Sequence, residues 1–555
     1  MTQTLVEVTD LTVDFPVGGA EQYVRAVDGV SFTLGEGRAL GIVGESGSGK
    51  STVAAALLGL HRGTGARLSG TVRVGGTDVA AASPAALRRL RGGTAAMVFQ
   101  DPLSSLDPYL AIGDQIAEVH RIHSGASRRA ARALAARVLD RVGIADAARR
   151  SRARPHEFSG GMRQRALIAM ALACEPRLLI ADEPTTALDV TVQAQILDLL
   201  HGLREERGLG LLLVTHDVGV AAESVDELLV MRDGSAVERG PTASVLTAPA
   251  EPYTRALLAA VPRLDGPRRS PGSVPGSVPG SAPDPVPDRT GEPVVEAVAL
   301  RREFGRRGRR VAAVAGVSLA VRAGETLGIV GESGSGKSTL GRMLVGLVEP
   351  DSGQVRHGGV PATGITAGVQ MVFQDPVSSL NPRRSVGDSV ADPLRAAGER
   401  DEAVLRARVG ELLERVGLEA GHFDRYPHEF SGGQRQRVGI ARALAPRPRL
   451  IVCDEPVSAL DVTTQAQVTA LLAELQREFG IALVFIAHDL AVVRQVSDRV
   501  AVMRAGEIVE EGPVDEVYDR PAHPYTRRLL DAVPGLDPGL ATERRTSRQE
   551  ALAGA

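Results

Sequence analysis

The chain has 555 residues, which is long enough for two or more domains with cores of their own. Its 64 lysine and arginine residues nearly balance 67 aspartate and glutamate residues, and the net charge of −3 excludes bulk electrostatic attraction to nucleic acid. Two cysteines exclude a disulfide framework and a cysteine-held metal cluster, and no apolar run approaches the roughly 18 residues of a membrane-spanning helix. We therefore expect a cytosolic chain without a signal peptide, which would work at a membrane only through another, spanning protein.

The first half opens on short alternating segments that lead into a glycine-rich loop. Residues 5–8 and 30–34 alternate between apolar and polar side chains, which predicts a small N-terminal sheet. An apolar run then precedes Gly-x-x-x-x-Gly-Lys-Ser at 44–51, and a helix-like sequence follows it. This order predicts a phosphate-binding loop, in which backbone N–H groups and a helix N-terminus surround a polyphosphate. The expected ATP contacts are Gly44, Glu45, Ser46, Gly47, Ser48, Gly49, Lys50, Ser51 and Thr52.

The loop and its flanks return in the second half without a single change over thirteen residues. Lys50 and Lys337 are the only two lysines of the sequence, although arginine is abundant elsewhere. An ammonium group is a compact point charge that fits inside a tight loop, whereas a guanidinium is a planar fork. We therefore expect both lysines to reach the β- and γ-phosphates, and Ser51 and Ser338 to hold Mg²⁺. The second set of ATP contacts is Gly331, Glu332, Ser333, Gly334, Ser335, Gly336, Lys337, Ser338 and Thr339.

Further motifs follow the loop in a fixed order. A strand-like segment precedes Gln100, and roughly 58 helix-rich residues separate it from a Ser-Gly-Gly segment that opens at Ser159. A buried-strand pattern then ends in Asp182 and Glu183, and the next strand ends at His216.

All of these motifs recur in the second half. From the Ser-Gly-Gly segment onward the offset is always 272 residues, as in the pairs 159 and 431, 182 and 454, and 216 and 488. So constant a spacing indicates two complete copies of one domain. A Pro/Gly/Ser-rich stretch without apolar periodicity lies between the copies and is typical of a semi-extended linker. We expect domains at 1–264 and 293–555, joined by a linker at 265–292.

An Asp-Glu pair at the end of a buried strand places two carboxylates beside the phosphate loop. We expect Asp182 and Asp454 to bind Mg²⁺, directly or through water. Glu183 and Glu455 would orient or deprotonate the attacking water.

Glutamine and histidine complete each expected site. Gln100 and Gln374 would sense Mg²⁺ and the γ-phosphate, and His216 and His488 would hydrogen-bond the γ-phosphate in a closed state. Each of these residues alone has an ordinary structural interpretation. Their repeated order in both halves favours the functional one.

The phosphate loop, glutamine, Ser-Gly-Gly segment, Asp-Glu strand and histidine of both halves resemble the ATP-binding cassette (ABC) family. The resemblance implies an α/β fold with two tandem nucleotide-binding domains. Each domain would have a RecA-like P-loop core, an N-terminal antiparallel β-subdomain and a helical subdomain. In this family two cassettes pair head to tail, here within one chain, and each ATP lies between the loop of one and the Ser-Gly-Gly signature of the other.

The signature opens a helix, expected from Met162 and Gln434 onward, whose N–H groups and dipole would meet a γ-phosphate. The ATP held by Lys50 would face Ser431, Gly432, Gly433 and Gln434, and the ATP held by Lys337 would face Ser159, Gly160 and Gly161. Members of the family also stack adenine on an aromatic ring of the N-terminal sheet. The candidates are Phe15 and Phe304, with Tyr23 also open in the first half.

Finer motifs resemble the ATPase subunits of dipeptide and oligopeptide importers, a group that includes nickel and glutathione uptake systems. These motifs are Gln-Asp-Pro-x-Ser-Ser-Leu-x-Pro at 100–108 and 374–382, and Pro-Tyr-Thr at 252–254 and 524–526. The halves are similar to the two ATPase types of that group, so the chain would be their fusion. Because the type with Met162 occurs among these ATPases, both sites are expected to hydrolyse ATP.

The resemblance implies ATP and Mg²⁺ as cofactors and an ATPase that drives uptake of peptides or a related small solute. The expected partners are two transmembrane permease subunits and, indirectly, an extracytoplasmic solute-binding protein. The expected location is the cytoplasmic face of the cell membrane, with the protein bound peripherally.

Two other functions stay open on the sequence. An ABC exporter ATPase shares all of this chemistry, and only the Pro-Tyr-Thr tails favour import. Soluble twin cassettes that act on ribosomes or DNA carry a long charged helical linker or zinc-binding cysteines, and this chain has neither. The arginine-rich stretch 301–310 fits a solvated loop better than a nucleic-acid patch, so no nucleic-acid partner is expected.

Overall fold

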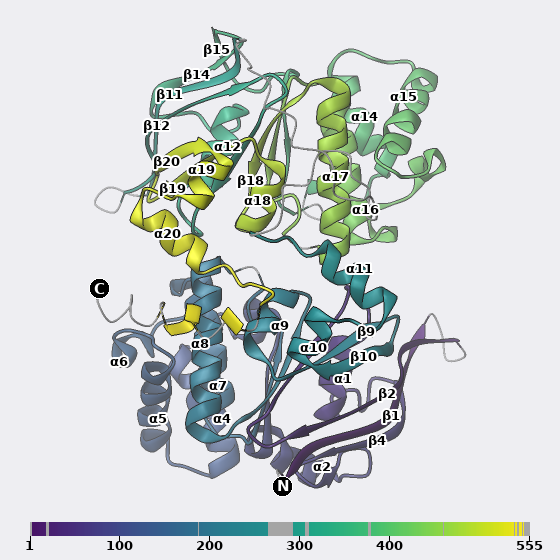
Figure 1. Ribbon diagram of the computed structural model, residues 1–555, viewed down its shortest axis with the longest axis vertical. Helices are drawn as coiled ribbons and strands as arrows, with labels where there is room; N and C mark the ends of the chain where they lie inside the picture. The colour runs from purple at the N-terminus through teal and green to yellow at the C-terminus, as the bar shows by residue number, and fades with distance from the viewer. Residues whose placement is uncertain are drawn as a thin grey trace. The chain divides into compact units, whose positions relative to one another are not determined.

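The computed structural model forms two compact units (Figure 1). It describes residues 3–17, 22–186, 188–264, 292–305, 310–375, 379–458, 460–537, 539–540, 543–546 and 548. Unit 1 consists of Met1–Leu188, Val192–Val261 and Pro534–Ala555, and unit 2 of Asp189–Thr191 and Pro262–Val533. These units are defined by contacts in space. They therefore differ from the two sequence repeats at the C-terminal end of each repeat. The linker expected at 265–292 lies outside the described residues except for its last residue.

A six-stranded sheet of order β10-β9-β3-β8-β7-β6 forms the centre of unit 1. Its strands are β3 (Ala39–Val43), β6 (Ala95–Val98), β7 (Leu178–Asp182), β8 (Gly210–Thr215), β9 (Glu227–Arg232) and β10 (Ser235–Pro241). All neighbours are parallel except β9 and β10. Every residue of β3, β7 and β8 is buried, as expected of parallel strands covered on both faces. The carboxyl ends of these three strands therefore meet at one edge.

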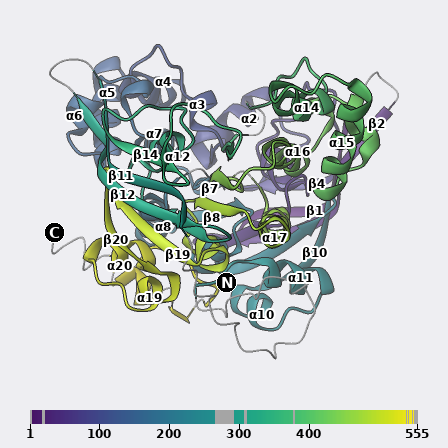
Figure 2. The same ribbon diagram turned by 90° about the horizontal axis from the view of Figure 1, so that it is seen from above.

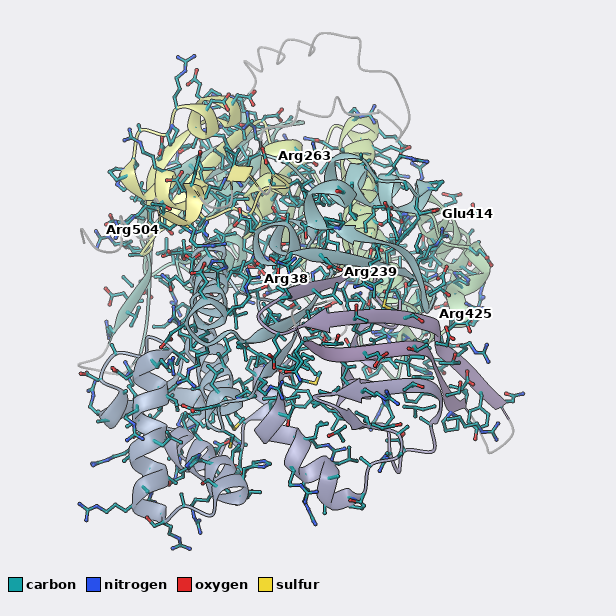
Figure 3. All side chains as sticks on the ribbon, turned by 60° about the horizontal axis from the view of Figure 1, so that its bottom comes forward. Arg38, Arg239, Arg263, Glu414, Arg425 and Arg504 are labelled. Carbon is teal, nitrogen blue, oxygen red and sulfur yellow. The ribbon has the colours of Figure 1, made fainter. Side chains whose placement is uncertain are left out.

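An antiparallel sheet of order β2-β1-β4-β5 packs against the central sheet of unit 1. Its strands are β1 (Thr4–Val17), β2 (Gln22–Gly35), β4 (Arg67–Val74) and β5 (Thr77–Asp78). Alternate residues such as Phe32 and Leu34 join a core with Leu40 and Ile42 of β3. Arg239 of β10, labelled in Figure 3, links the two sheets because it donates to the backbone oxygen of Thr33 at 3.0 Å.

Helices complete unit 1. They are α1 (Lys50–Leu57), α2 (Pro84–Arg89), α3 (Pro102–Ser105), α4 (Ile112–Ser124), α5 (Arg128–Arg141), α6 (Ala147–Arg150), α7 (Gly160–Leu172), α8 (Val190–Arg207), α9 (Val218–Ser224), α10 (Thr242–Thr247) and α11 (Pro252–Ala260). Helices α4, α5 and α7 gather at the opposite side of the unit from β1, β2 and β4 (Figures 1 and 2). They form the expected helical subdomain, inserted between β6 and β7.

Unit 2 repeats this architecture. Its central sheet has the order β16-β17-β18-β13-β19-β20 and its antiparallel sheet the order β12-β11-β14-β15. The strands are β11 (Pro293–Phe304), β12 (Val311–Arg322), β13 (Thr326–Val330), β14 (Ser352–His357), β15 (Val360–Pro361), β16 (Val369–Val372), β17 (Leu450–Asp454), β18 (Ala482–Ile486), β19 (Arg499–Arg504) and β20 (Glu507–Pro513). The helices are α12 (Lys337–Leu344), α14 (Val386–Ala396), α15 (Glu402–Arg415), α16 (Gly432–Leu444), α17 (Val462–Phe479), α18 (Leu490–Val496), α19 (Val514–Asp519) and α20 (Pro524–Asp531). Each unit therefore has the α/β core, antiparallel sheet and helical subdomain that the sequence predicts.

Among the described residues, no helix is both long enough and apolar enough to cross a lipid bilayer. The two cysteines are free thiols. Cys453 is buried in β17, where burial raises the pKa of its thiol to about 12. Cys174 is only half-buried.

Candidate functional site

Each glycine-rich loop lies between a central strand and the helix that starts at its lysine. Helix α1 begins at Lys50 after Gly49, whose φ of 93° lies in the left-handed region. A Cβ at Gly44 would overlap the backbone oxygen of Met231, and a Cβ at Gly49 would overlap that of Ala26. Only glycine fits at these two positions, because the loop backbone runs directly against neighbouring strands.

The second loop repeats this geometry. Gly336 has a φ of 105° and precedes α12, which begins at Lys337. A Cβ at Gly331 would overlap the backbone oxygen of Met503. Two loops with the same steric requirement explain why the glycines recur without change.

Both lysines are buried and turn their ammonium groups back onto the loop. The Nζ atom of Lys50 donates to the backbone oxygens of Gly44 and Glu45, at 2.8 and 2.6 Å. The Nζ atom of Lys337 donates to those of Gly331 and Glu332, at 2.7 and 2.9 Å. Burial lowers the pKa of Lys337, although nearby carboxylates oppose the shift. A polyphosphate within the loop would place further negative charge beside each ammonium group.

The serine after each lysine contacts the aspartate at the end of β7 in unit 1 or of β17 in unit 2. Ser51 Oγ donates to Asp182 Oδ1 at 3.0 Å, and Ser338 Oγ donates to Asp454 Oδ1 at 2.7 Å. Burial raises the pKa of Asp182 to about 6, and it raises the pKa of Asp454 as well. A hydroxyl and a carboxylate at this distance are the hard oxygen donors that Mg²⁺ prefers.

The next residue, a glutamate, meets glutamine and histidine in unit 1. Gln100 Nε2 donates to Glu183 Oε2 at 2.7 Å, and His216 Nδ1 lies 3.1 Å from Glu183 Oε1. Burial opposes the charge of both groups, but their mutual hydrogen bond and attraction prevail. The pKa of Glu183 is therefore lowered and that of His216 raised. Thr186 Oγ1 is a third donor to this carboxylate, at 3.0 Å.

Unit 2 assembles the same three residue types. Gln374 Nε2 donates to Glu455 Oε2 at 2.7 Å, and His488 Nδ1 lies 3.6 Å from the same oxygen. Burial again opposes charge, yet the pKa of Glu455 is lowered and that of His488 raised by their pairing. Residues from three separate parts of each half thus converge beside the Ser–Asp pair.

The glutamates also share an unusual backbone. Glu183 and Glu455 both have a φ of 47°, in the left-handed region that side-chain-bearing residues seldom adopt. Their N–H groups donate to the backbone oxygens of Val214 and Ile486, at 2.8 and 2.9 Å. The adjacent strand therefore holds each glutamate in a conformation that costs energy, as functional residues often are.

The Ser-Gly-Gly segments begin helices, as expected, although two residues earlier than predicted. Helices α7 and α16 start at Gly160 and Gly432, and Ser159 and Ser431 are their N-caps. The cap oxygens accept from the N–H groups three residues on, at 3.3 Å in both units. A Cβ at Gly161 would overlap Val192, and one at Gly433 would overlap Thr464. The N-terminal end of each helix, where backbone N–H groups and the helix dipole favour negative charge, is the end that a phosphate would approach.

The candidate adenine-stacking residues lie at equivalent ends of β1 and β11. Phe15 is half-buried and packs edge-on against His61, with ring centroids 5.2 Å apart. Phe304 is 45% exposed, and the Arg302 guanidinium lies 5.1 Å from its ring centroid. Tyr23 is instead covered by Arg67, at 3.8 Å.

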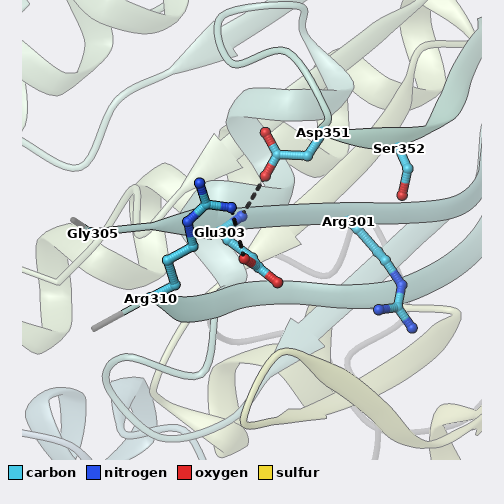
Figure 4. Close-up of a pocket in the computed structure, with 6 residues that line it drawn as sticks. All are labelled: Arg301, Glu303, Gly305, Arg310, Asp351 and Ser352. Carbon is cyan, nitrogen blue, oxygen red and sulfur yellow. Dashed lines mark hydrogen bonds and ion pairs between the residues drawn. The ribbon is translucent and has the colours of Figure 1, made fainter. Parts of the chain in front are cut away.

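Close to Phe304, a polar hollow of about 450 Å³ opens at the end of β11 (Figure 4). Its lining residues are Arg301, Glu303, Gly305, Arg310, Asp351 and Ser352. The charges here pair among themselves, since Arg310 lies 3.6 Å from Glu303 and Arg302 lies 2.8 Å from Asp351. Residues 306–309 of the arginine-rich stretch lie outside the described residues. This hollow contains none of the predicted site residues.

One contact near the phosphate loop was missed by the sequence analysis. Tyr525, in the Pro-Tyr-Thr motif at the start of α20, is 3% exposed, and its hydroxyl accepts from the N–H of Glu332 at 3.1 Å. Arg504 lies over its ring, as Arg232 lies over Tyr253 in unit 1. Burial raises the pKa of both tyrosines to about 12, so their hydroxyls stay neutral. The recurrence of Pro-Tyr-Thr in both halves was the one sequence feature that could have indicated this contact.

A glutamate of the preceding hairpin anchors each Pro-Tyr-Thr motif. The carboxylate of Glu510 accepts from the N–H groups of Ala522 and His523, at 2.7 and 3.1 Å. Glu238 accepts in the same way from Ala250 and Glu251, at 2.8 and 3.2 Å. The motif is therefore a fixed part of each unit rather than a loose tail.

Comparison with known proteins is consistent with this geometry. A model of the ABC transporter family matches residues 27–186 and 314–458. A model of the oligopeptide/dipeptide transporter C-terminal region matches 237–286 and 509–554, which include both Pro-Tyr-Thr motifs.

Individual relatives match nearly the whole chain. The glutathione import ATP-binding protein GsiA of Escherichia coli (strain K12) is 48% identical over 552 residues, covering 93% of this chain and 88% of that protein. The protein of the same name from Salmonella typhimurium is 46% identical over 574 residues, covering 98% and 91%. A solved ATP-binding cassette with ADP and phosphate covers 40% of this chain and 98% of its own, with 30% identity and a TM-score of 0.37. The chain belongs to the ABC transporter family, and its two halves are ATP-binding cassettes of the oligopeptide/dipeptide transporter type.

Proposed function

We propose that this chain is the ATP-hydrolysing subunit of an importer for glutathione or short peptides, with an ATP site in each half. The observation that carries the ATPase part is the convergence of Gln, Glu and His beside a Ser–Asp pair in both units. The glutathione import ATP-binding proteins, which match most of the chain, support the choice of cargo class.

Each loop would bind the phosphates through its N–H groups and its lysine, Lys50 or Lys337. Mg²⁺ would be held by Ser51 and Asp182 in the first half and by Ser338 and Asp454 in the second, where the hydroxyl and carboxylate oxygens suit it. Gln100 and Gln374 would be additional ligands. Bound there, the ion would neutralise charge that develops on the phosphates.

Glu183 and Glu455 would align the attacking water and accept its proton. A lowered pKa keeps both carboxylates ionised at neutral pH, as this role requires. His216 and His488, whose pKa is raised, would donate a hydrogen bond toward the γ-phosphate. Movement of Gln100 or Gln374 away from the glutamate would free the carboxylate for water.

The two halves, 1–264 and 293–555, would pair head to tail within one chain, with 265–292 as the connection. Each ATP would then face the Ser-Gly-Gly helix of the opposite half. Two transmembrane permease subunits and an extracytoplasmic solute-binding protein would complete the importer, with this chain on the cytoplasmic face of the membrane.

Cargo is tested by reconstitution. The chain would be purified with its permease subunits and binding protein, and uptake of labelled glutathione, a dipeptide and Ni²⁺ measured in vesicles with and without ATP. We expect ATP-dependent uptake of glutathione or dipeptide, abolished by Glu183→Gln together with Glu455→Gln. Uptake of Ni²⁺ alone, or ATP-driven efflux, would refute the proposed cargo while leaving the ATPase intact.

Pairing is tested by cross-linking. In a chain with Cys174 and Cys453 replaced, Ser46→Cys would be combined with Ser431→Cys or, as the matched control, with Ser159→Cys. Glu183→Gln and Glu455→Gln would hold bound ATP. We expect an ATP-dependent intrachain disulfide for the first pair alone, because disulfides need Cα atoms within about 7 Å. Cross-linking of the control pair, or links only between separate chains, would overturn the arrangement.

A further inference from the structure

The last described residues of the chain dock in unit 1, although they follow helix α20 of unit 2 in sequence. Figure 1 draws them in yellow beside α8 and α9. The N–H of Gly535 donates to Glu223 Oε1 at 3.1 Å, and Arg544 Nη1 lies 3.2 Å from the same oxygen. Arg545 Nη2 donates to the backbone oxygen of Glu223, also at 3.2 Å. Glu223, in α9, thus receives three separate donors from this segment.

A second acid, in α8, receives the final arginine. Arg548 binds Asp198 through two parallel hydrogen bonds, Nε to Oδ2 at 3.2 Å and Nη2 to Oδ1 at 2.9 Å. Arg545 lies 3.8 Å from the same carboxylate and also contacts the ring of His201. Burial and the charge of Arg545 lower the pKa of His201, which keeps its ring neutral. Such a two-pronged arginine–carboxylate pair fixes orientation as well as distance.

These charges are withdrawn from solvent. The Glu223 side chain is 5% exposed, and those of Asp198 and Arg548 are 15% and 12% exposed. A buried carboxylate without a cation is costly, so an empty pocket of two such acids would be unfavourable. Residues 543–546 and 548 are helical, and arginines three or four positions apart share one helix face. The segment therefore presents the arginines together.

The second half of the sequence lacks this acidic pair. At 272 residues beyond Asp198 and Glu223 stand Ala470 and Gln495, in the equivalent helices α17 and α18. The first half does not repeat the arginines at these positions. Gly272, Ser273 and Gly276 stand 272 residues before Arg544, Arg545 and Arg548, and the arginines of the first-half tail are at 263, 268 and 269 instead. Acids and arginines thus occur as one complementary set rather than as a feature of both halves.

We propose that Asp198 and Glu223 form a receptor pocket for an arginine-bearing C-terminal segment of the second-half type, and that this charge pairing decides which tail the pocket accepts. The partner it fits is a short helix with arginines spaced three to four residues apart and no acid facing the pocket. In this chain the segment is the one that carries Arg544, Arg545 and Arg548. The pairing would act in one direction only, because Ala470 and Gln495 offer no charge to a tail.

Limited trypsin digestion of the full chain tests the proposal, since trypsin cleaves after arginine. The rate of cleavage at Arg544 and Arg545 would be measured by intact mass and divided by the rate at arginines elsewhere in the chain. Asp198→Asn with Glu223→Gln should raise this ratio about tenfold, because both charge-assisted contacts are lost. The matched control Gln495→Ala should leave the ratio unchanged.

Exchanging the charges of residues 198 and 548 distinguishes loss of this ion pair from general destabilisation of the fold. Asp198→Arg alone should raise the ratio, and adding Arg548→Asp should return it to within about twofold of the wild-type value, because the pair is restored with reversed sign. An unchanged ratio in the double pocket variant, an equal rise in Gln495→Ala, or no recovery in the exchanged pair would each overturn the proposal.

Discussion

The two cassettes share their reacting groups and differ in what surrounds them. In each, a serine binds an aspartate and a glutamate binds a glutamine and a histidine. Glu183 has Thr186 as an additional donor, whereas Ser458, at the matching position, turns its hydroxyl to the backbone oxygen of Glu455. The histidine contact is also shorter in unit 1, at 3.1 Å against 3.6 Å.

The signature helices differ as well. Gln434 Oε1 accepts from the N–H of Ser431 at 3.0 Å, which closes a capping box that Met162 lacks the oxygen to form. The differences therefore lie in the contacts of the glutamate and histidine and in the fourth signature residue, which is Met162 in unit 1 and Gln434 in unit 2. We therefore expect both sites to hydrolyse ATP, but with different rates and affinities.

Replacing either lysine should have the largest effect, and it tests whether both halves contain an ATP site that uptake requires. Lys50→Ala or Lys337→Ala should each reduce ATP-driven uptake roughly 100-fold or more, because the buried ammonium group stabilises phosphate charge in a water-poor site. Uptake by the reconstituted importer measures this. If one variant transports at the wild-type rate, the ATP site of that half is not required for transport, and the two halves are not functionally equivalent.

The second-largest effect should come from protonation of Asp182, which competes with Mg²⁺ binding. Burial raises the pKa of Asp182 to about 6, and only its ionised form is a good Mg²⁺ ligand. The Mg²⁺ affinity of the first site should therefore fall about tenfold per pH unit below pH 6 and be constant above it. Mg²⁺-dependent ATP binding at pH 5–8, in a Lys337→Ala background, measures this site alone. Asp182→Asn controls for titration of ATP itself, and the same pH profile in that variant would contradict the assignment.

Tyr525→Phe should produce a smaller effect. It keeps the ring beneath Arg504 but leaves the Glu332 N–H without its acceptor. We expect KM for ATP at the second site to rise about threefold while kcat changes little, as for loss of one neutral hydrogen bond. Tyr518→Phe is the matched control, because its hydroxyl donates to Leu490 instead of the loop. Equal kinetics for the two variants would show that the Tyr525 hydroxyl does not help to position the phosphate loop.

The smallest expected effect sharpens the difference between the signatures. Gln434→Met removes the capping-box oxygen from α16 and should weaken ATP-dependent closure about twofold, and Met162→Gln should strengthen it to a similar extent. ATP concentration for half-maximal hydrolysis measures both. Shifts in the same direction would show that the capping box is not the relevant difference.

The sequence predicted the architecture because the same periodic patterns occur twice. It also placed Gln100, Glu183 and His216 at strand ends, and the carboxyl ends of neighbouring parallel strands meet at one sheet edge. The strand lengths were underestimated, since β1 and β2 extend over Thr4–Val17 and Gln22–Gly35. Their polar outer parts pair through a bulged hairpin ladder that periodicity alone does not reveal.

Other contacts depended on tertiary structure. Tyr525 reaches Glu332 across 193 residues, and Arg548 reaches Asp198 across 350. No local pattern specifies such pairs, because side-chain direction is set by the packing of the elements that carry them. The difference between Thr186 and Ser458 is of the same kind, since both hydroxyls can serve either acceptor.

The number of ATP molecules bound per chain shows directly whether each half holds its own site. Equilibrium binding of ATP with Mg²⁺ would be measured on the full chain carrying Glu183→Gln and Glu455→Gln, which should bind ATP without turning it over. We expect two ATP per chain, and one when Lys50→Ala or Lys337→Ala is added. One ATP per chain with both lysines present, or no loss on removing a lysine, would contradict it.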